Sequence, residues 1–407
     1  MEHQLELLSP AGDLESLRYA IAYGADAVYL GAAEFGMRAA AQNFSVEKEL
    51  PEAVEYAHQK GKKVYLTVNT IPTNKEAVQL PRFLGAAAEA GVDAFIVSDI
   101  GVMALAGQIA PFVDLHVSTQ AGVMNYATAA TLYNLGAKRI VLARELPLQD
   151  IAFIREHTPS ELELEAFVHG SMCMSVSGRC LLSSYLTGRD ANRGECAQPC
   201  RWEWELHEKN RPGMAFPIGE NEGGSYILNA DDLCMAPFLD LLADAGVSSF
   251  KIEGRGKSFY YVASVTGAYR RAVDALKAGG EYLCPVETLE ELTRTSHRKY
   301  STGFYFGREN ATQNTESSSY IRDWEVVAAV EKSEEGRIFC TQRGKFISGE
   351  TLEALLPTGE AVPIVPRDLR DAQGQPISAT PHAMMAFSFA ADISFPPMAL
   401  LRKKTAQ

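Results

Sequence analysis

Long hydrophobic runs are absent from this sequence of 407 residues. No apolar stretch approaches the roughly 18 residues that a membrane-spanning helix requires, and no basic and apolar leader opens the chain. Hydrophobic residues make up 46% of the chain and charged residues 22%, as in ordinary globular proteins. We therefore expect a cytoplasmic globular protein that does not contact a membrane.

An excess of positive charge is also absent. The chain has 38 lysines and arginines against 51 aspartates and glutamates, a net charge of −13. This charge argues against a nucleic-acid binder with a basic overall surface, because such proteins neutralise phosphates with lysine and arginine. A local basic patch can still occur on an acidic protein. Two clusters are candidates for such a patch, namely Arg179, Arg189, Arg193 and Arg201, and further on Lys251, Arg255, Lys257, Arg270 and Arg271.

Two motifs of hydrolytic enzymes are missing. The sequence has no His-Glu-x-x-His zinc helix and no Gly-x-Ser-x-Gly nucleophile elbow. A cysteine peptidase remains an alternative, since a thiolate beside a base is a nucleophile and Cys173 follows His169 by four residues. That spacing in a loop does not by itself establish the geometry of a catalytic pair.

Cysteine is scarce and unevenly distributed. The chain has seven cysteines, none precedes Cys173, and four of them lie within the 28 positions that end at Cys200. Their spacing, C-x6-C-x15-C-x3-C, fits the paired ligands of structural zinc sites poorly, whereas iron–sulfur clusters on four thiolates tolerate more varied spacing. Free buried thiols are the alternative. Because a reducing compartment disfavours disulfides, metal binding is the better interpretation.

Apolar strands alternate with amphipathic helices from the start of the chain to about residue 278. Eight such strands favour a TIM-like (β/α)8 barrel, and an open doubly wound sheet is the alternative. The expected strands are 5–9, 27–31, 64–70, 94–99, 115–120, 139–145, 162–170 and 249–254. The expected helices are 14–24, 45–59, 74–90, 101–109, 126–135, 147–156, 236–245 and 258–278.

Polar residues follow these strands at their carboxyl ends, where the active sites of such barrels lie. They are Asn69, Asp99, Gln120, Arg144, Glu145, Glu165 to His169, Glu253 and Arg255. Among them we predict Glu165, His169 and Glu253 to be catalytic. The alternative interpretation of His169 is an ordered loop histidine whose ring nitrogens are satisfied.

Arginine is the side chain best suited to bind an anionic substrate, because its guanidinium pairs with a carboxylate through two hydrogen bonds. We therefore predict that Arg144, Arg179 and Arg255 bind substrate. The alternatives are structural ion pairs, in which Arg255 contacts Glu253 and Arg144 contacts a neighbouring carboxylate.

The last part of the chain has a different pattern. Residues 291–307 are polar, and short β-rich runs punctuated by glycine and proline follow them, which is typical of a small all-β barrel or sandwich. We predict three parts: a barrel over 1–284 with a Cys-rich loop at 165–204, a linker over 285–310, and a small β-barrel domain over 311–407.

Residues 165–204 resemble the signature of the collagenase-like peptidase family U-32, and residues 249–258 support the resemblance. The match runs through Glu-x-Phe, Gly-Ser, Cys173, Ser-Gly-Arg-Cys180, Arg-Gly-x-Cys196 and Cys200-Arg-Trp. Within that family the chain is most similar to the tRNA hydroxylation group. The resemblance implies a 4Fe-4S cluster on Cys173, Cys180, Cys196 and Cys200, with Cys234 as the alternative fourth ligand.

The resemblance also implies the reaction. It predicts an RNA-modifying enzyme that converts the wobble uridine of tRNA to 5-hydroxyuridine and requires prephenate, a small dicarboxylate, as a metabolite. In this hypothesis tRNA contacts the β domain and the rim of the barrel. The alternatives are a collagenase-like peptidase, a related hydroxylation protein acting on rRNA or a quinone, and a member of a heteromer with a paralogous partner.

Overall fold

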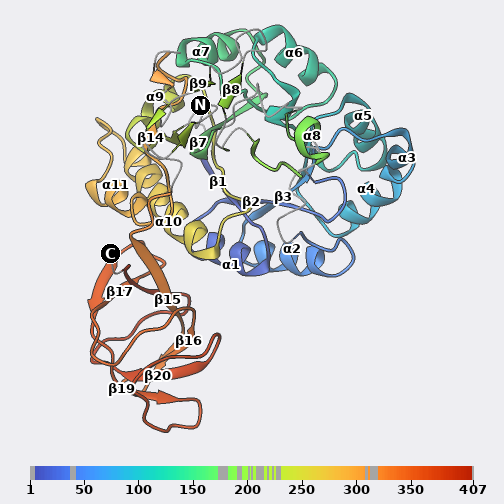
Figure 1. Ribbon diagram of the computed structural model, residues 1–407. Helices are drawn as coiled ribbons and strands as arrows, with labels where there is room; N and C mark the ends of the chain where they lie inside the picture. The colour runs from blue at the N-terminus through green and yellow to red at the C-terminus, as the bar shows by residue number, and fades with distance from the viewer. Residues whose placement is uncertain are drawn as a thin grey trace.

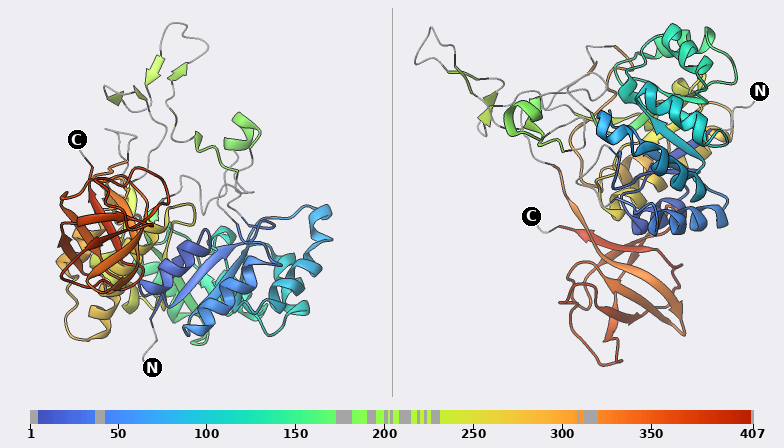
Figure 2. Two further views of the ribbon diagram at one scale, coloured as in Figure 1. Left: turned by 90° about the horizontal axis from the view of Figure 1, so that it is seen from below. Right: turned by 90° about the vertical axis from the view of Figure 1, so that its right-hand side faces the viewer.

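The computed structural model consists of a helix-surrounded barrel and a smaller β domain beside it (Figure 1). The structure describes residues 5–36, 43–172, 182–189, 195–199, 202, 205–207, 215–217, 220–221, 224–225, 231–307, 310–311 and 320–405. In the views of Figure 2 the β domain lies on the flank of the barrel, against the ring of helices rather than across its axis.

Eight parallel strands form a closed barrel. The closure is made by β13, which pairs in parallel with both β1 and β7. This confirms the TIM-like barrel and excludes the open sheet. In an open sheet the first and last parallel strands would be edges, and β13 could not pair with both β1 and β7. The strands are β1 (Glu6–Pro10), β2 (Ala27–Gly31), β3 (Lys63–Val68), β4 (Ala94–Val97), β5 (Asp114–Val117), β6 (Arg139–Val141), β7 (Glu163–Ser171) and β13 (Ser249–Ile252).

Helices surround the barrel in the order that the sequence predicts (Figure 1). They are α1 (Leu14–Ala22), α2 (Glu49–Gln59), α3 (Asn74–Ala77), α4 (Leu80–Glu89), α5 (Ile100–Ile109), α6 (Tyr126–Asn134), α7 (Leu148–Glu156), α9 (Leu239–Asp244) and α10 (Phe259–Lys277). Asp13 caps α1, because its side chain accepts a hydrogen bond from the Ser16 amide at 2.7 Å. No helix in the described part of the chain combines the length and apolar character that crossing a bilayer would take.

The helix expected over 74–90 is divided into α3 and α4. Pro81 lies in the first turn of α4, where its missing amide hydrogen costs nothing. Within a continuous helix the same proline would remove a hydrogen bond and clash with the preceding turn. The chain therefore ends one helix and starts the next.

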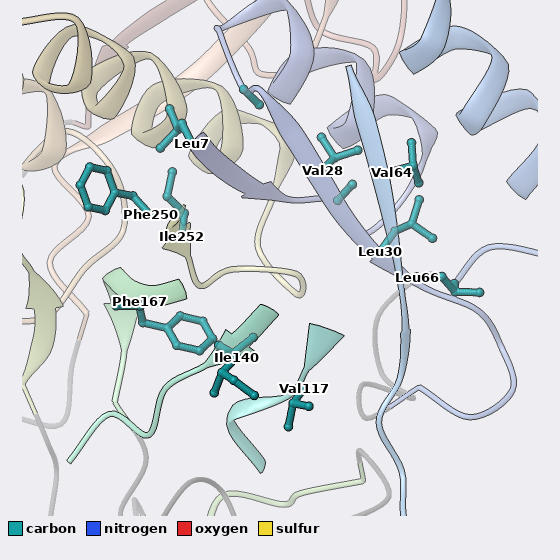
Figure 3. Close-up of a cluster of buried hydrophobic side chains, with 14 of the residues drawn as sticks. Leu7, Val28, Leu30, Val64, Leu66, Val117, Ile140, Phe167, Phe250 and Ile252 are labelled. Atoms are coloured by element: carbon teal, nitrogen blue, oxygen red, sulfur yellow. The ribbon is translucent and has the colours of Figure 1, made fainter. Parts of the chain in front are cut away.

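Strands β1 to β4 are mostly apolar on both faces because both faces are buried. Leu7, Val28 and Val64 point outward and pack against the helices (Figure 3). Tyr29 and Tyr65 point inward and belong to a second cluster inside the barrel. This double burial explains why the strands appear in the sequence as near-continuous hydrophobic runs.

Residues 285–310, which we expected to form a linker, contain α11 (Val286–Leu292) and β14 (Tyr300–Ser301). The helix packs on α10. The strand pairs with β12 (Asp232–Cys234), which is antiparallel to β7 and extends the barrel sheet outward. The segment looks polar in sequence because several of its buried residues are charged and pair with residues of other elements. Arg298, for example, forms an ion pair with Asp232 of β12.

The long segment between β7 and β12 contains short elements beyond the carboxyl ends of the barrel strands (Figure 2). They are α8 (Leu182–Thr187), β8 (Glu205–His207), β9 (Ala215–Pro217), β10 (Glu220–Asn221) and β11 (Gly224–Ser225). Helix α8, which belongs to the expected Cys-rich loop, therefore lies on the side of the barrel where active sites form.

The C-terminal domain is all-β, as predicted. Its seven antiparallel strands run in the order β18-β17-β21-β15-β16-β20-β19 around a separate hydrophobic core. No pairing joins β18 to β19 among the described residues, so the sheet is a half-barrel rather than a closed one. The strands are β15 (Trp324–Glu334), β16 (Arg337–Gln342), β17 (Leu352–Leu355), β18 (Ala361–Ile364), β19 (Arg367–Asp371), β20 (Ala386–Ala390) and β21 (Leu400–Lys404).

The two domains share a buried interface. One hydrophobic cluster contains Tyr19 of α1 and the C-cap residue Tyr23, side chains of α10, and Leu355 and Leu400 from the β domain. The hydroxyl of Tyr23 donates a hydrogen bond to the carbonyl of Leu355 at 2.9 Å. Beside this cluster, Arg402 pairs with Glu291 through two hydrogen bonds of 2.5 and 2.7 Å. Apolar packing and a buried ion pair therefore hold the β domain in one position on the barrel.

Candidate active site

The mouth of the barrel brings together predicted site residues from three strands. Arg144 follows β6, and its Nη2 lies 2.8 Å from Oε2 of Glu253, which follows β13. Its Nη1 donates to the carbonyl of Ser171 at the end of β7, at 2.7 Å. The guanidinium also lies 3.8 Å from the ring centroid of Phe167. These contacts fix the position and plane of Arg144 at the mouth.

Arg255 occupies a second, more deeply buried place at the mouth, with 4% of its surface exposed. Its Nη1 donates to Oγ1 of Thr67 at 2.7 Å. The position depends on Gly31 at the end of β2, because a Cβ atom there would lie 2.3 Å from Arg255 Nη1. A second glycine, Gly12, makes room for the Arg255 main chain, since its Cβ would lie 2.5 Å from the Arg255 carbonyl oxygen.

The mouth thus has two arginines, one stacked and ion-paired and one buried against a threonine. Thr67 and Gly31 were not among the predicted site residues. A glycine at the end of an otherwise large-residue strand is a signal that sequence reasoning could have used, because it marks a close approach of another group. The arrangement favours binding of a small, planar or dianionic molecule.

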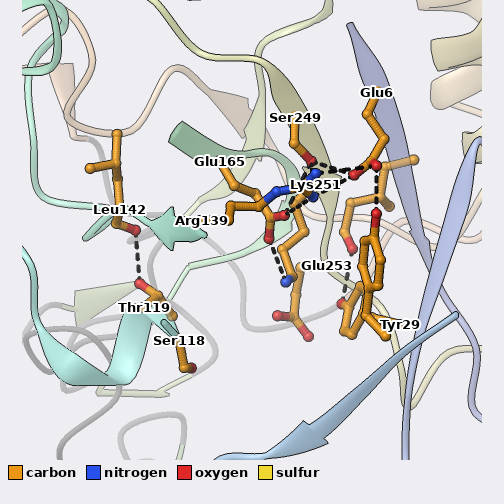
Figure 4. A network of polar contacts seen from close by, with 12 residues as sticks. Glu6, Tyr29, Ser118, Thr119, Arg139, Leu142, Glu165, Ser249, Lys251 and Glu253 are labelled. Carbon is orange, nitrogen blue, oxygen red and sulfur yellow. Dashed lines mark hydrogen bonds and ion pairs between the residues drawn. The ribbon is translucent and has the colours of Figure 1, made fainter. Parts of the chain in front are cut away.

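Glu165 lies deeper than the strand end where we expected it. Inside the barrel its Oε1 accepts from Lys251 Nζ at 2.7 Å, and its Oε2 accepts from Arg139 Nη1 at 2.9 Å (Figure 4). Arg139 also pairs with Glu6 at 2.5 Å. Burial opposes ionisation of Glu6, but the charge and hydrogen bonds of Arg139 prevail and lower its pKa. Glu165 therefore belongs to a buried charge network beneath the mouth, and its catalytic role stays a prediction.

His169 lies in a buried tyrosine cluster on the outer side of β7. Its ring centroid is 5.3 Å from those of Tyr269 and Tyr300, and its Nδ1 is 3.3 Å from the hydroxyl of Tyr269. Burial lowers the pKa of His169 to about 3, so the imidazole is neutral at physiological pH. This position corresponds to the ordered histidine that we considered as the alternative, and its catalytic role stays a prediction.

Two of the five predicted cluster ligands are described. The half-buried Cys196 accepts a hydrogen bond from the Gln198 amide at 3.3 Å on its Sγ, and such bonds stabilise thiolate ligands. Cys234 is buried on β12, where Tyr269 donates to its Sγ at 3.8 Å, and burial raises its thiol pKa to about 11. Cys173, Cys180 and Cys200 lie outside the described residues, as does Arg179. Among the described residues no group of three or more potential metal ligands occurs.

The second basic cluster of the sequence does not form one patch. Lys251 is buried against Glu165, Arg270 pairs with Asp26 at 3.0 Å, and Arg271 donates to the carbonyl of Gly359. Lys257 lies at the rim of the mouth, near the ring of Tyr261. In the first cluster Arg189 is exposed, and Arg193 and Arg201 lie outside the described residues.

Comparison with known proteins agrees with this architecture over nearly the whole chain. Residues 12–315 match peptidase family U32 and residues 322–402 match the peptidase family U32 C-terminal domain. A tRNA hydroxylation protein P of Helicobacter pylori is 41% identical over 376 residues, which cover 90% of this chain and 87% of that protein. An uncharacterized protease of Methanocaldococcus jannaschii is 46% identical over 305 residues, 74% of this chain and 73% of the relative. A 23S rRNA 5-hydroxycytidine synthase of Escherichia coli is 35% identical over 376 residues, 92% of this chain but 52% of the relative.

Proposed function

This chain belongs to peptidase family U32, and we propose that it is an RNA-modifying hydroxylase that acts on tRNA. The observation that carries the proposal is its 41% identity to a tRNA hydroxylation protein across both domains, with 87% of that protein covered. The similar rRNA hydroxylation enzyme is about twice as long as the matched region, since only 52% of it is covered. The shared two-domain length therefore favours tRNA over rRNA as the substrate.

The proposed reaction is prephenate-dependent hydroxylation of the wobble uridine to 5-hydroxyuridine. Prephenate carries two carboxylates, and the mouth offers two guanidinium groups, those of Arg144 after β6 and Arg255 after β13. The proposed 4Fe-4S cluster would be held by Cys173, Cys180, Cys196 and Cys200 and would supply electron transfer. Cys196 fits this role because it is half-buried and its sulfur accepts a backbone hydrogen bond.

The test of the function is complementation. The chain is expressed in an Escherichia coli strain that makes no 5-hydroxyuridine, and the nucleosides of its tRNA are separated and identified by mass spectrometry. We expect 5-hydroxyuridine to appear, and to disappear in a second strain that also cannot make prephenate. A soluble chain that yields no modified nucleoside would contradict the proposal, and modification without prephenate would contradict the metabolite.

Replacing Cys196 with alanine is expected to remove the cluster, whereas the same change at Cys234 is expected to leave it in place. The physical reason is the position of the two sulfurs, because Cys234 is buried on β12 and accepts a hydrogen bond from Tyr269, whereas Cys196 is half-buried in the Cys-rich segment. After anaerobic purification, iron, acid-labile sulfide and absorption near roughly 400 nm report the cluster independently of activity. About four irons in the wild type and in Cys234→Ala, with loss in Cys196→Ala, is the expected pattern. Iron loss in Cys234→Ala without loss in Cys196→Ala would reverse the assignment.

A peptidase is the second candidate, because a relative with 46% identity is described as a protease. A Cys173–His169 pair would need an imidazole that accepts a proton. His169 is packed among tyrosines with its pKa lowered to about 3, which makes it a weak base. Hydrolysis of gelatin by the purified chain that is lost in Cys173→Ala and retained in Cys196→Ala would favour the peptidase.

A further inference from the structure

A row of aromatic and basic side chains connects the rim of the barrel mouth to the C-terminal domain. We define the rim ridge as Lys257, Tyr320, Arg322, Trp324 and Lys404. Lys257 lies in the turn that follows Arg255 at the mouth, and its Nζ is 4.6 Å from the centroid of the Tyr320 ring. Trp324 begins β15 and lies opposite Lys404 of β21. The ridge therefore runs continuously from the mouth onto the C-terminal sheet.

Both aromatic rings of the ridge are surrounded by cations. The charge centres near the Tyr320 ring are those of Lys257 at 4.6 Å, Arg298 at 4.5 Å and Arg322 at 5.7 Å. Those near Trp324 are Arg294 at 5.0 Å, Arg402 at 5.3 Å and Lys404 at 5.9 Å. An aromatic face holds a cation in place but does not cancel its charge, whereas a carboxylate would cancel it. Arg298, Arg294 and Arg402 also pair with carboxylates, whereas the exposed Arg322 and Lys404 lie farthest from the two ring centroids.

Strand alternation separates the charges of β15 and β21. Trp324 pairs with Lys404, and the next pair along the ladder is Glu325 with Lys403. Because successive side chains point to opposite faces, the Glu325–Lys403 pair, 3.6 Å apart, lies on the other face from the ridge. Glu325, one of the two acidic neighbours of Trp324 in sequence, therefore does not neutralise Lys404.

The carboxylates beneath the ridge already have partners. Glu291 and Glu353 pair with the buried Arg402, and Asp232 pairs with the buried Arg298. By contrast, Arg322 and Lys404 are exposed and make no ion pair with any carboxylate that the structure describes. The ridge therefore presents positive charge to solvent, although the chain as a whole carries a net charge of −13.

We propose that the rim ridge binds the phosphodiester backbone of tRNA, an inference that rests on the proposed function. Lysine and arginine contacts to phosphates supply affinity and orientation but do not select bases. A backbone held along the ridge passes the barrel mouth at Lys257, where a nucleotide can reach the Arg144 and Arg255 site. The ridge thus positions the RNA, and the mouth selects the nucleotide.

The test is tRNA binding by the full chain in which Arg322→Ala and Lys404→Ala are combined. The probe is an unmodified, fluorescently labelled tRNA transcript, and its anisotropy is titrated at several salt concentrations. We expect the Kd to rise about tenfold near physiological salt, and the slope of log affinity against log salt to fall by roughly 1 to 2. Both side chains are exposed, so thermal unfolding of the double variant should match that of the wild type.

A matched control removes the same charge from the same domain. Lys332 and Arg367 are exposed cations of β15 and β19, and β19 lies at the end of the domain far from the barrel (Figure 1). Combining Lys332→Ala with Arg367→Ala should leave the Kd within about twofold of the wild-type value. Equal weakening in both double variants, unchanged binding in the ridge variant, or no tRNA binding by the wild type would each overturn the proposal. Complementation by the wild type reports the proposed function separately, so 5-hydroxyuridine formation with unaltered binding would refute the ridge alone.

Discussion

Replacing Arg402 with methionine is expected to lower the free energy of unfolding by roughly 3–5 kcal/mol, because the buried Glu291 loses both of its hydrogen bonds to Arg402 and keeps only a longer ion pair, to Arg294 at 3.7 Å. The Arg402 side chain is fully buried and donates to both oxygens of Glu291 and to Oε1 of Glu353. Glu291 is 3% exposed, so water cannot replace the lost partner. Urea unfolding followed by fluorescence measures the effect, and limited proteolysis shows whether the β domain separates from the barrel.

The control for this experiment is Lys332→Met in the same domain. Lys332 is exposed and pairs with Glu334 at the surface, where such ion pairs contribute about 0–1 kcal/mol. A triple variant with Arg402→Met, Glu291→Met and Glu353→Met should recover part of the stability, since it removes the carboxylates that lost Arg402. Unfolding of Arg402→Met at the wild-type urea concentration would show that the interface is held by apolar packing alone.

Replacing Gly31 with alanine is expected to reduce 5-hydroxyuridine formation about a hundredfold, the typical cost of a displacement of about 1 Å in an active site. The added Cβ would lie 2.3 Å from Arg255 Nη1 and 2.7 Å from its Cζ, so the guanidinium must leave its hydrogen bond with Thr67. The change alters no charge and no predicted catalytic residue. Complementation followed by nucleoside mass spectrometry measures the loss.

Gly85→Ala is the matched control for this prediction. Gly85 lies in α4, and no atom lies within 4 Å of the position that its Cβ would take. Alanine there should leave activity unchanged and slightly stabilise the helix. Arg255→Lys should reproduce the loss seen with Gly31→Ala, because a lysine cannot make the same planar contacts. Wild-type activity in both Gly31→Ala and Arg255→Lys would remove Arg255 from the proposed site.

The fold follows from the sequence to a large extent. Each of the eight predicted barrel strands is present within a few residues of its expected bounds, and the C-terminal domain is all-β. This succeeded because strands buried on both faces, such as 27–31, form short apolar runs between clear helix caps and glycines. Residues 285–310 were harder to predict, because polar side chains that are buried in pairs resemble those of an exposed linker.

The sequence predicted the candidate active site less closely than it predicted the fold. Arg144, Glu253 and Arg255 lie at the mouth, since the carboxyl ends of barrel strands meet at one face, and their roles there stay predictions. Glu165 and His169 lie on the same strand, β7, but one points into the barrel below the mouth and the other into a tyrosine cluster. Strand β7 continues past its neighbours and pairs with β12, which changes the surroundings of its last residues. The hydrophobic pattern of the sequence does not reveal this pairing.

By itself the sequence determined the order of strands and helices, the acidic net charge and the concentration of four cysteines in one segment, since periodicity, charge and spacing are local properties. Only the tertiary structure decided that the barrel closes through β13, that Gly31 makes room for Arg255, and that Tyr320, Trp324 and Lys404 form one ridge. The physical reason is the same in each case. These contacts join residues far apart in the chain, and their energies depend on burial and distance, which exist only once the chain has folded.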